Sequence, residues 1–142
     1  MDVYRHRVQY YETDKMGIVH HSNFIRWMEE ARVDFLAQSG WNYDRLESMG
    51  IVSPVLAVEC KYRLSVRFPE LITIKVSVAK FDGLKLRINY EMLNEKCDIV
   101  CKAHSEHCFL DSDGRPIRMK NDYPEFYKSM MYYLDADDQP LG

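Results

Sequence analysis

The chain has 142 residues with a formal net charge of −3, and this length predicts a single domain, residues 1–142, whose core needs no disulfide or metal. The charge lacks the basic surplus of a nucleic-acid binder, and there is neither a run of about eighteen apolar residues nor an N-terminal export signal. We therefore expect a cytoplasmic protein with no nucleic-acid partner and no membrane insertion.

A strand followed by a long helix is predicted for the first forty residues. Residues 3–12 have strand-like composition, and the turn at residues 14–17 ends them. Over residues 24–38 the apolar positions recur at helical spacing, and Gly40 ends this helix.

The middle of the chain is rich in strand signals. A short helical piece near Leu46 precedes extended chain. Residues 72–78 and 84–92 alternate between apolar and polar side chains, and Asp82-Gly83 between them predicts a tight antiparallel hairpin. A third strand covers about residues 99–110 and ends in a turn.

The predicted sheet has one apolar face, and one long helix is available to cover it. The sheet is therefore expected to curl around that helix in an α+β fold. A short C-terminal extension from about residue 121 includes a helix after Pro124, which we expect to dock on the surface or at a subunit contact. Residues from Asp135 onward are acidic and expected to fray.

The cysteines and histidines do not indicate a metal site. The four cysteines lack paired ligand spacing, and three lie in strand-like sequence, where a thiol fills apolar space. They are Cys60, Cys97, Cys101 and Cys108. His104 and His107 are three residues apart, which in a strand directs them to opposite faces. We expect no metal.

The run of residues 10–24 predicts an active-site loop. A strand ends and a helix begins around one carboxylate, Asp14. The first turn of a helix has N–H groups with no partner inside the helix, which catalysis can use. His21 lies at this helix start, where Ser22 and Asn23 are good N-cap residues.

The same run carries a family resemblance. The matching residues are Tyr10, Asp14, Gly17, Val19, His21, Asn23 and Phe24, followed by Trp27-Met-Glu-Glu-Ala-Arg32. In this context they resemble hotdog-fold acyl-CoA thioesterases of the 4-hydroxybenzoyl-CoA thioesterase type. The resemblance extends from about residue 3 to residue 120 and includes the segment from Tyr62 to Leu71, although Glu70 stands where an Asp is commoner.

The resemblance implies a hotdog fold, in which the sheet wraps the central helix, and dimers that join their sheets side by side and assemble into homotetramers. It also implies that Asp14 is the catalytic carboxylate and that the backbone N–H of His21 polarises the thioester carbonyl. In the bacterial branch closest to this chain, the equivalents of Tyr10 and of the His21 side chain are implicated as well. An amide donor suits this reaction because negative charge develops on the carbonyl oxygen during attack.

Several roles stay open from the sequence. Asp14 either attacks the carbonyl itself or activates a water molecule. Glu29 is an alternative second carboxylate, although a solvated helix face also explains it. Three residues that alternate along a predicted strand are candidates for binding the phosphates of coenzyme A. They are Arg63, Ser65 and Arg67, with Lys61 preceding them.

The sequence thus predicts an acyl-CoA thioesterase that releases a free carboxylic acid and CoA. No cofactor is expected, because coenzyme A is part of the substrate and a product. Acyl carrier protein is an alternative thioester donor or binding partner, and a hotdog hydratase or dehydratase acting on enoyl thioesters is a further rival. The acyl chain is not constrained, because the large apolar residues of the helix also explain the core.

Overall fold

The structure is a computed structural model that describes residues 1–135. Five antiparallel strands form one sheet in the order β1-β3-β4-β5-β2. The strands are β1 (Tyr4–Arg7), β2 (Val55–Tyr62), β3 (Leu71–Phe81), β4 (Lys85–Leu93) and β5 (Ile99–Cys108). The helices are η1 (Tyr10–Glu12), a short 3-10 helix, and α1 (Ser22–Gln38), α2 (Tyr43–Ser48), α3 (Met119–Asp122) and α4 (Pro124–Tyr132).

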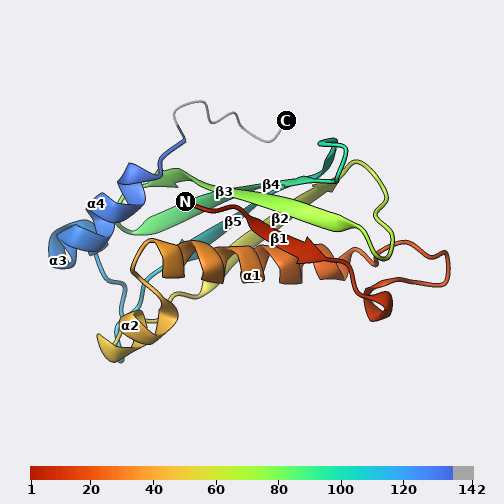
Figure 1. Cartoon of the computed structure of the whole chain (residues 1–142). Coiled ribbons are helices and arrows are strands. Elements are labelled where there is room, and N and C mark those ends of the chain that lie inside the picture. Colours follow the sequence, from red (N-terminus) through yellow and green to blue (C-terminus); the bar gives the residue numbers. More distant parts are fainter. Residues whose placement is uncertain (136–142) are drawn as a thin grey trace.

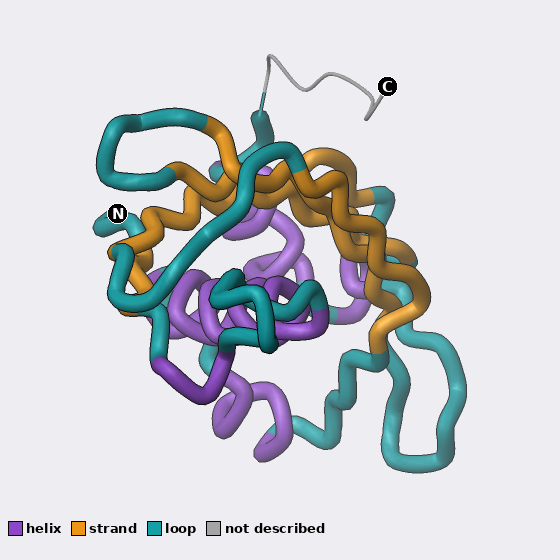
Figure 2. Tube along the Cα trace, turned by 90° about the vertical axis from the view of Figure 1, so that its right-hand side faces the viewer, coloured by secondary structure: helices purple, strands orange, loops and turns teal. Residues whose placement is uncertain are grey.

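The sheet lies across one side of α1 (Figure 1), and the view along the helix shows the strands arching over it (Figure 2). The helical spacing of Trp27, Met28 and Phe35 places them on one face of α1, and all three are buried in the core. The inward positions of β3 and β4, such as Ile74 and Ile88, are buried in the same core. This architecture confirms the predicted α+β hotdog fold.

The hairpin of β3 and β4 follows the predicted alternation, and Phe81 pairs with Leu86 at its end. A three-residue loop joins the strands in place of the expected two-residue turn. The Asp82 carboxylate accepts the backbone N–H groups of Leu84 and Lys85, each at 2.8 Å. Gly83 has φ +93°, a backbone conformation that glycine adopts at little cost because it has no Cβ atom.

The predicted N-terminal strand is too long. It ends at Arg7, and Tyr10 lies on η1. The reason is that the Glu12 carboxylate accepts the Gln9 N–H at 2.7 Å and thereby closes a turn that takes the chain out of the sheet. Strand pairing with β3 accordingly stops at Arg7, which lies opposite Leu71.

The predicted N-caps of α1 are also wrong. His21 is the N-cap residue, and Ser22 and Asn23 lie in the first turn of the helix. The Asn23 amide is used elsewhere, because its Nδ2 donates to the Glu12 carbonyl at 2.9 Å. The N–H of Ser22 donates to Nδ1 of His20 at 3.3 Å.

The helix predicted after Pro124 is present as α4, but it does not dock on the surface. Phe126 and Met130 are fully buried, and the Phe126 ring packs edge-on against Trp41 and Phe109 with centroids 5.3 and 5.2 Å away. The extension therefore completes the core. The expected fraying from Asp135 onward concerns residues that, apart from Asp135 itself, lie outside the described residues.

Within residues 1–135, none of the helices combines the length and the apolar character needed to cross a bilayer. A cytoplasmic location stays a prediction. No group of three or more His, Cys, Asp or Glu side chains in the same range is arranged to hold a metal ion. All four cysteines are free thiols.

Candidate active site

Asp14 lies at the base of a small loop that projects between β1 and α1. Thr13 and Val19 form a bridge across this loop, and the Asp14 N–H donates to the Ile18 carbonyl at 2.8 Å. The Asp14 carboxylate accepts the Met16 N–H at 2.8 Å. These bonds fix the backbone on both sides of Asp14. Within residues 1–135 its second carboxylate oxygen accepts no hydrogen bond, so it is available to act on a ligand.

Glu12 connects the two ends of this loop. No signal in the sequence pointed to this residue. The residue is only 4% exposed. Its carboxylate accepts from the Trp27 indole Nε1 at 2.6 Å and contacts His6 Nε2 at 2.8 Å. Its backbone carbonyl accepts the His20 N–H and the Asn23 Nδ2, both at 2.9 Å. Glu12 therefore joins β1, the loop and the first turns of α1.

The Glu12 carboxyl group is held in its charged form. Burial by itself raises the pKa of Glu12, but hydrogen bonds from His6, Gln9 and Trp27 outweigh burial and keep the pKa below its ordinary value of 4.5. Because a carboxylate only accepts hydrogen bonds, Nε2 of His6 carries the shared proton. The other ring nitrogen of His6 lies 3.4 Å from the Glu30 carboxylate.

His21 places an unused donor at the start of α1. Asn23 N–H donates to the His20 carbonyl at 3.0 Å and Phe24 N–H to the His21 carbonyl at 3.2 Å. In contrast, no acceptor for the His21 N–H is found among the described residues. The positive end of the helix dipole lies at the same place. An oxygen that gains negative charge is stabilised in such a position.

A cleft of about 400 Å³ brings the predicted groups together. Four of the residues predicted for the site line it: Asp14, His21, Arg63 and Ser65. The complete lining is Asp14, Met16, Ile18, Val19, His20, His21, Phe24, Tyr62, Arg63, Leu64, Ser65 and Val66. A carboxylate and a free amide on the walls of one cleft can attack a carbonyl carbon and stabilise the resulting oxyanion.

The family model of the Thioesterase-like superfamily matches residues 8–132. The chain belongs to this superfamily. YneP of Bacillus subtilis (strain 168), whose name gives it as a candidate acyl-CoA thioesterase, is 30% identical over 121 residues, which cover 84% of this chain and 88% of YneP. YbgC of Escherichia coli O157:H7, named an acyl-CoA thioester hydrolase, is 22% identical over 114 residues, which cover 80% of this chain and 82% of YbgC.

Among solved structures, the DHNA-CoA thioesterase from Staphylococcus aureus is similar with a TM-score of 0.86 and 31% identity. The superposition covers 92% of this chain and 88% of that chain. The family resemblance and the enzyme class predicted from the sequence, a thioester hydrolase, are thereby confirmed.

Two residues predicted for the thioesterase site do not line the cleft. Tyr10 is 77% exposed, and its ring packs edge-on against Phe68 with centroids 5.9 Å apart. Arg67 lies outside the cleft with Nη1 3.5 Å from the Gly17 carbonyl. The prediction that Arg63, Ser65 and Arg67 lie on a strand is wrong, because β2 ends at Tyr62 and an irregular loop follows.

Tyr62 is a cleft residue to which the sequence assigned no role. Its hydroxyl donates to the His21 carbonyl at 3.3 Å, and its ring centroid lies 5.1 Å from that of Phe24. Partial burial and the neighbouring Cys60 thiol raise the pKa of Tyr62 above its ordinary value of 10.0, so the phenol stays a donor at neutral pH. Tyr62 begins the segment that resembles the family's connection into the third strand, and this was the available signal.

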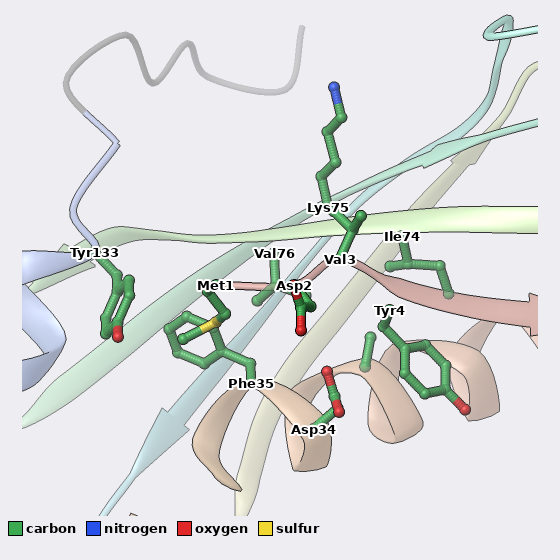
Figure 3. A pocket seen from close by; sticks show the side chains of 11 residues that line it. Met1, Asp2, Val3, Tyr4, Asp34, Phe35, Ile74, Lys75, Val76 and Tyr133 are labelled. Atoms are coloured by element: carbon green, nitrogen blue, oxygen red, sulfur yellow. The ribbon is translucent and has the colours of Figure 1, made fainter. Parts of the chain in front are cut away.

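Two other hollows lack the paired groups of the thioesterase cleft. One of about 120 Å³ lies between the N-terminus, α1 and β3, where the side chains of Phe35 and Tyr133 limit it (Figure 3). The second is a groove of about 640 Å³ on the outer side of α1, and its lining includes Glu29 and Arg26. Glu29 does not line the cleft that contains Asp14.

Proposed function

We propose that the protein hydrolyses the thioester of acyl-CoA to a free carboxylic acid and CoA. The observation that carries this proposal is that one cleft contains both the Asp14 carboxylate and the His21 N–H, which has no acceptor in the described part of the chain. The names of the superfamily relatives support the same substrate class.

The proposed chemistry assigns separate roles to the two groups. The His21 N–H donates to the thioester oxygen, and one such donor contributes about 100- to 1000-fold in rate. Asp14 attacks the carbonyl carbon or removes a proton from the attacking water. The His21 side chain is proposed to orient the bound substrate. Its ring packs against that of His20, with centroids 4.2 Å apart. The thiolate is a good leaving group, so a carboxylate and an amide are adequate.

Positive charge at the cleft supports coenzyme A as the thiol part of the substrate. We propose that Arg63 and Ser65 in the cleft wall and Arg67 beside it bind the phosphates. Neither guanidinium group has a carboxylate within 4.0 Å among the described residues. Because free guanidinium groups bind phosphate with two hydrogen bonds, they suit this substrate.

We further propose that the protein forms a dimer through β2 and a homotetramer from two dimers. β2 is an edge strand that pairs with β5 on one side only. Its apolar side chains Val55, Leu56 and Val58 are exposed, which is costly for an unpaired edge. Light scattering coupled to size-exclusion chromatography tests this assembly, and a monomer at micromolar concentration would refute it.

The test of function is thiol release from a panel of short, long and aromatic acyl-CoAs. We expect Asp14→Asn to lower kcat by at least about 100-fold. The variant should keep its fold, because an amide oxygen still accepts the Met16 N–H. Asp44→Asn, which removes the same charge from the exposed first turn of α2, is the matched control.

Each alternative has its own outcome in this test. Thiol release from acyl carrier protein thioesters alone would favour a carrier-protein thioesterase. Consumption of an enoyl thioester without free thiol would favour the hydratase rival. Binding of carrier protein without turnover would favour a binding module. An Asp14→Asn variant with full activity would refute the role of Asp14.

A further inference from the structure

Tyr10 and Phe68 form an exposed aromatic pair beside the cleft. Tyr10 is 77% exposed and Phe68 is 49% exposed, although their ring centroids are only 5.9 Å apart at an interplanar angle of 85°. The two rings come from η1 and from the loop after β2, which are far apart in the sequence. Two large rings held together in solvent, outside the core, offer a surface for a flat apolar ligand.

Two arginines flank this aromatic pair. Arg67 precedes Phe68, and its Nη1 is held 3.5 Å from the Gly17 carbonyl. Arg7 Nη1 donates to the carbonyl of Pro69, which follows Phe68, at 3.0 Å. Neither guanidinium is within 4.0 Å of a carboxylate among residues 1–135. The nearby Glu70 carboxylate accepts the Arg67 backbone N–H at 2.6 Å instead.

The aromatic pair is continuous with the wall of the catalytic cleft. The loop after β2 supplies Arg63 and Val66 to the cleft and reaches Phe68 two residues later. This loop is attached to the catalytic turn by the Ile18–Arg67 bridge and by the Val19 N–H, which donates to the Val66 carbonyl at 2.8 Å. A ligand whose reactive end lies at Asp14 therefore meets the aromatic pair if it extends along this loop.

We propose that Tyr10 and Phe68, together with Arg7 and Arg67, bind the adenine nucleotide end of coenzyme A. The rings supply a stacking surface for the base, and the arginines supply charge for the 3′-phosphate and the diphosphate. The inference rests on the proposed function, because it takes acyl-CoA as the substrate. It gives Tyr10 a binding role in place of the catalytic role that the resemblance implied.

The experiment compares acyl-CoA with the same acyl group on pantetheine, which keeps the thioester and lacks the nucleotide. Tyr10→Ala and Phe68→Ala are each expected to raise the KM for acyl-CoA by about 5- to 100-fold. For both variants, kcat and the KM for acyl-pantetheine should change by less than about twofold. Tyr11→Ala is the matched control, because Tyr11 is 79% exposed and has no ring contact among the described residues.

Loss of kcat on both substrates in Tyr10→Ala would overturn the inference and support a catalytic role for Tyr10. An equal rise of KM for both substrates would also overturn it. Dissociation of the assembly by Phe68→Ala, measured by light scattering, would show that a second copy of the chain covers the patch, and would likewise overturn it.

Failure of the proposed function gives a result different from failure of the nucleotide site. It corresponds to a wild-type protein that releases thiol from neither substrate. Calorimetric titration with adenosine 3′,5′-bisphosphate then decides the inference by itself. Binding that Phe68→Ala weakens at least fivefold, and Tyr11→Ala does not, supports the nucleotide site. Absence of binding to the wild type overturns it.

Discussion

Replacing Glu12 with Gln tests whether this buried carboxylate holds the catalytic loop on the helix. The wild-type side chain accepts three hydrogen bonds, from Gln9 N–H at 2.7 Å, His6 Nε2 at 2.8 Å and Trp27 Nε1 at 2.6 Å. A glutamine amide has one acceptor oxygen and one NH₂ group. If its oxygen faces His6 and Gln9, its NH₂ group opposes the Trp27 N–H. If the amide is flipped, its NH₂ group opposes the Gln9 N–H.

The lost hydrogen bonds set how far the free energy of unfolding of Glu12→Gln should fall. At least one charge-assisted hydrogen bond is lost, which costs about 1.5 to 3 kcal/mol. One buried donor is also left unsatisfied, which costs about 1 kcal/mol more. We therefore expect the free energy of unfolding to fall by about 3 kcal/mol. At about 3 °C per kcal/mol for a chain of this size, the Tm should fall by about 9 °C.

The sign of the pH dependence gives a second readout. Because the folded pKa of Glu12 lies below 4.5, the stabilisation by its carboxylate is fully present above pH 4.5 and is lost as the pH falls through the folded pKa. The difference in free energy between wild type and Glu12→Gln should therefore shrink in acid. Urea denaturation at a series of pH values measures both quantities.

A matched control is Glu47→Gln on α2, which removes the same charge from an exposed side chain. It should change the free energy of unfolding by less than about 0.5 kcal/mol. The reasoning would be refuted by a Glu12→Gln variant as stable as this control, or by a difference from wild type that does not depend on pH.

Two further predictions concern the scaffold. Gly83→Ala should lower the free energy of unfolding, measured by urea denaturation, by about 2 kcal/mol more than Gly40→Ala does. Both glycines have positive φ, but only a Cβ atom added at Gly83 would clash, because the Lys120 Cβ lies 2.8 Å from it. Equal losses would contradict this. Burial and the charge of Arg32 lower the pKa of His107 from 6.5 to about 3. The unfolded state therefore binds more protons between these values, and the free energy of unfolding should fall by up to about 1.4 kcal/mol for each unit by which the pH is lowered from 6.5 towards 3. His107→Gln should flatten that slope, and an unchanged slope would contradict the assignment.

The sequence by itself determined the elements whose pattern is local. The apolar period of α1 and the alternation of β3 and β4 repeat over many residues, so each side chain's direction follows from its position in the chain. The loop with Asp14 and His21 was also found from the sequence, because its motif lies within one short run. These signals predicted the fold class and the carboxylate and amide of the candidate site.

Only the tertiary structure decided which polar side chains are buried. Glu12 is stabilised by Trp27, 15 residues away. Arg32 is buried and donates to Tyr90, 58 residues away, at 3.2 Å. The place of Tyr10 beside Phe68 likewise depends on two distant segments. Burying a charged group is favourable only when partners satisfy it, and those partners come together only after the sheet has curled around the helix.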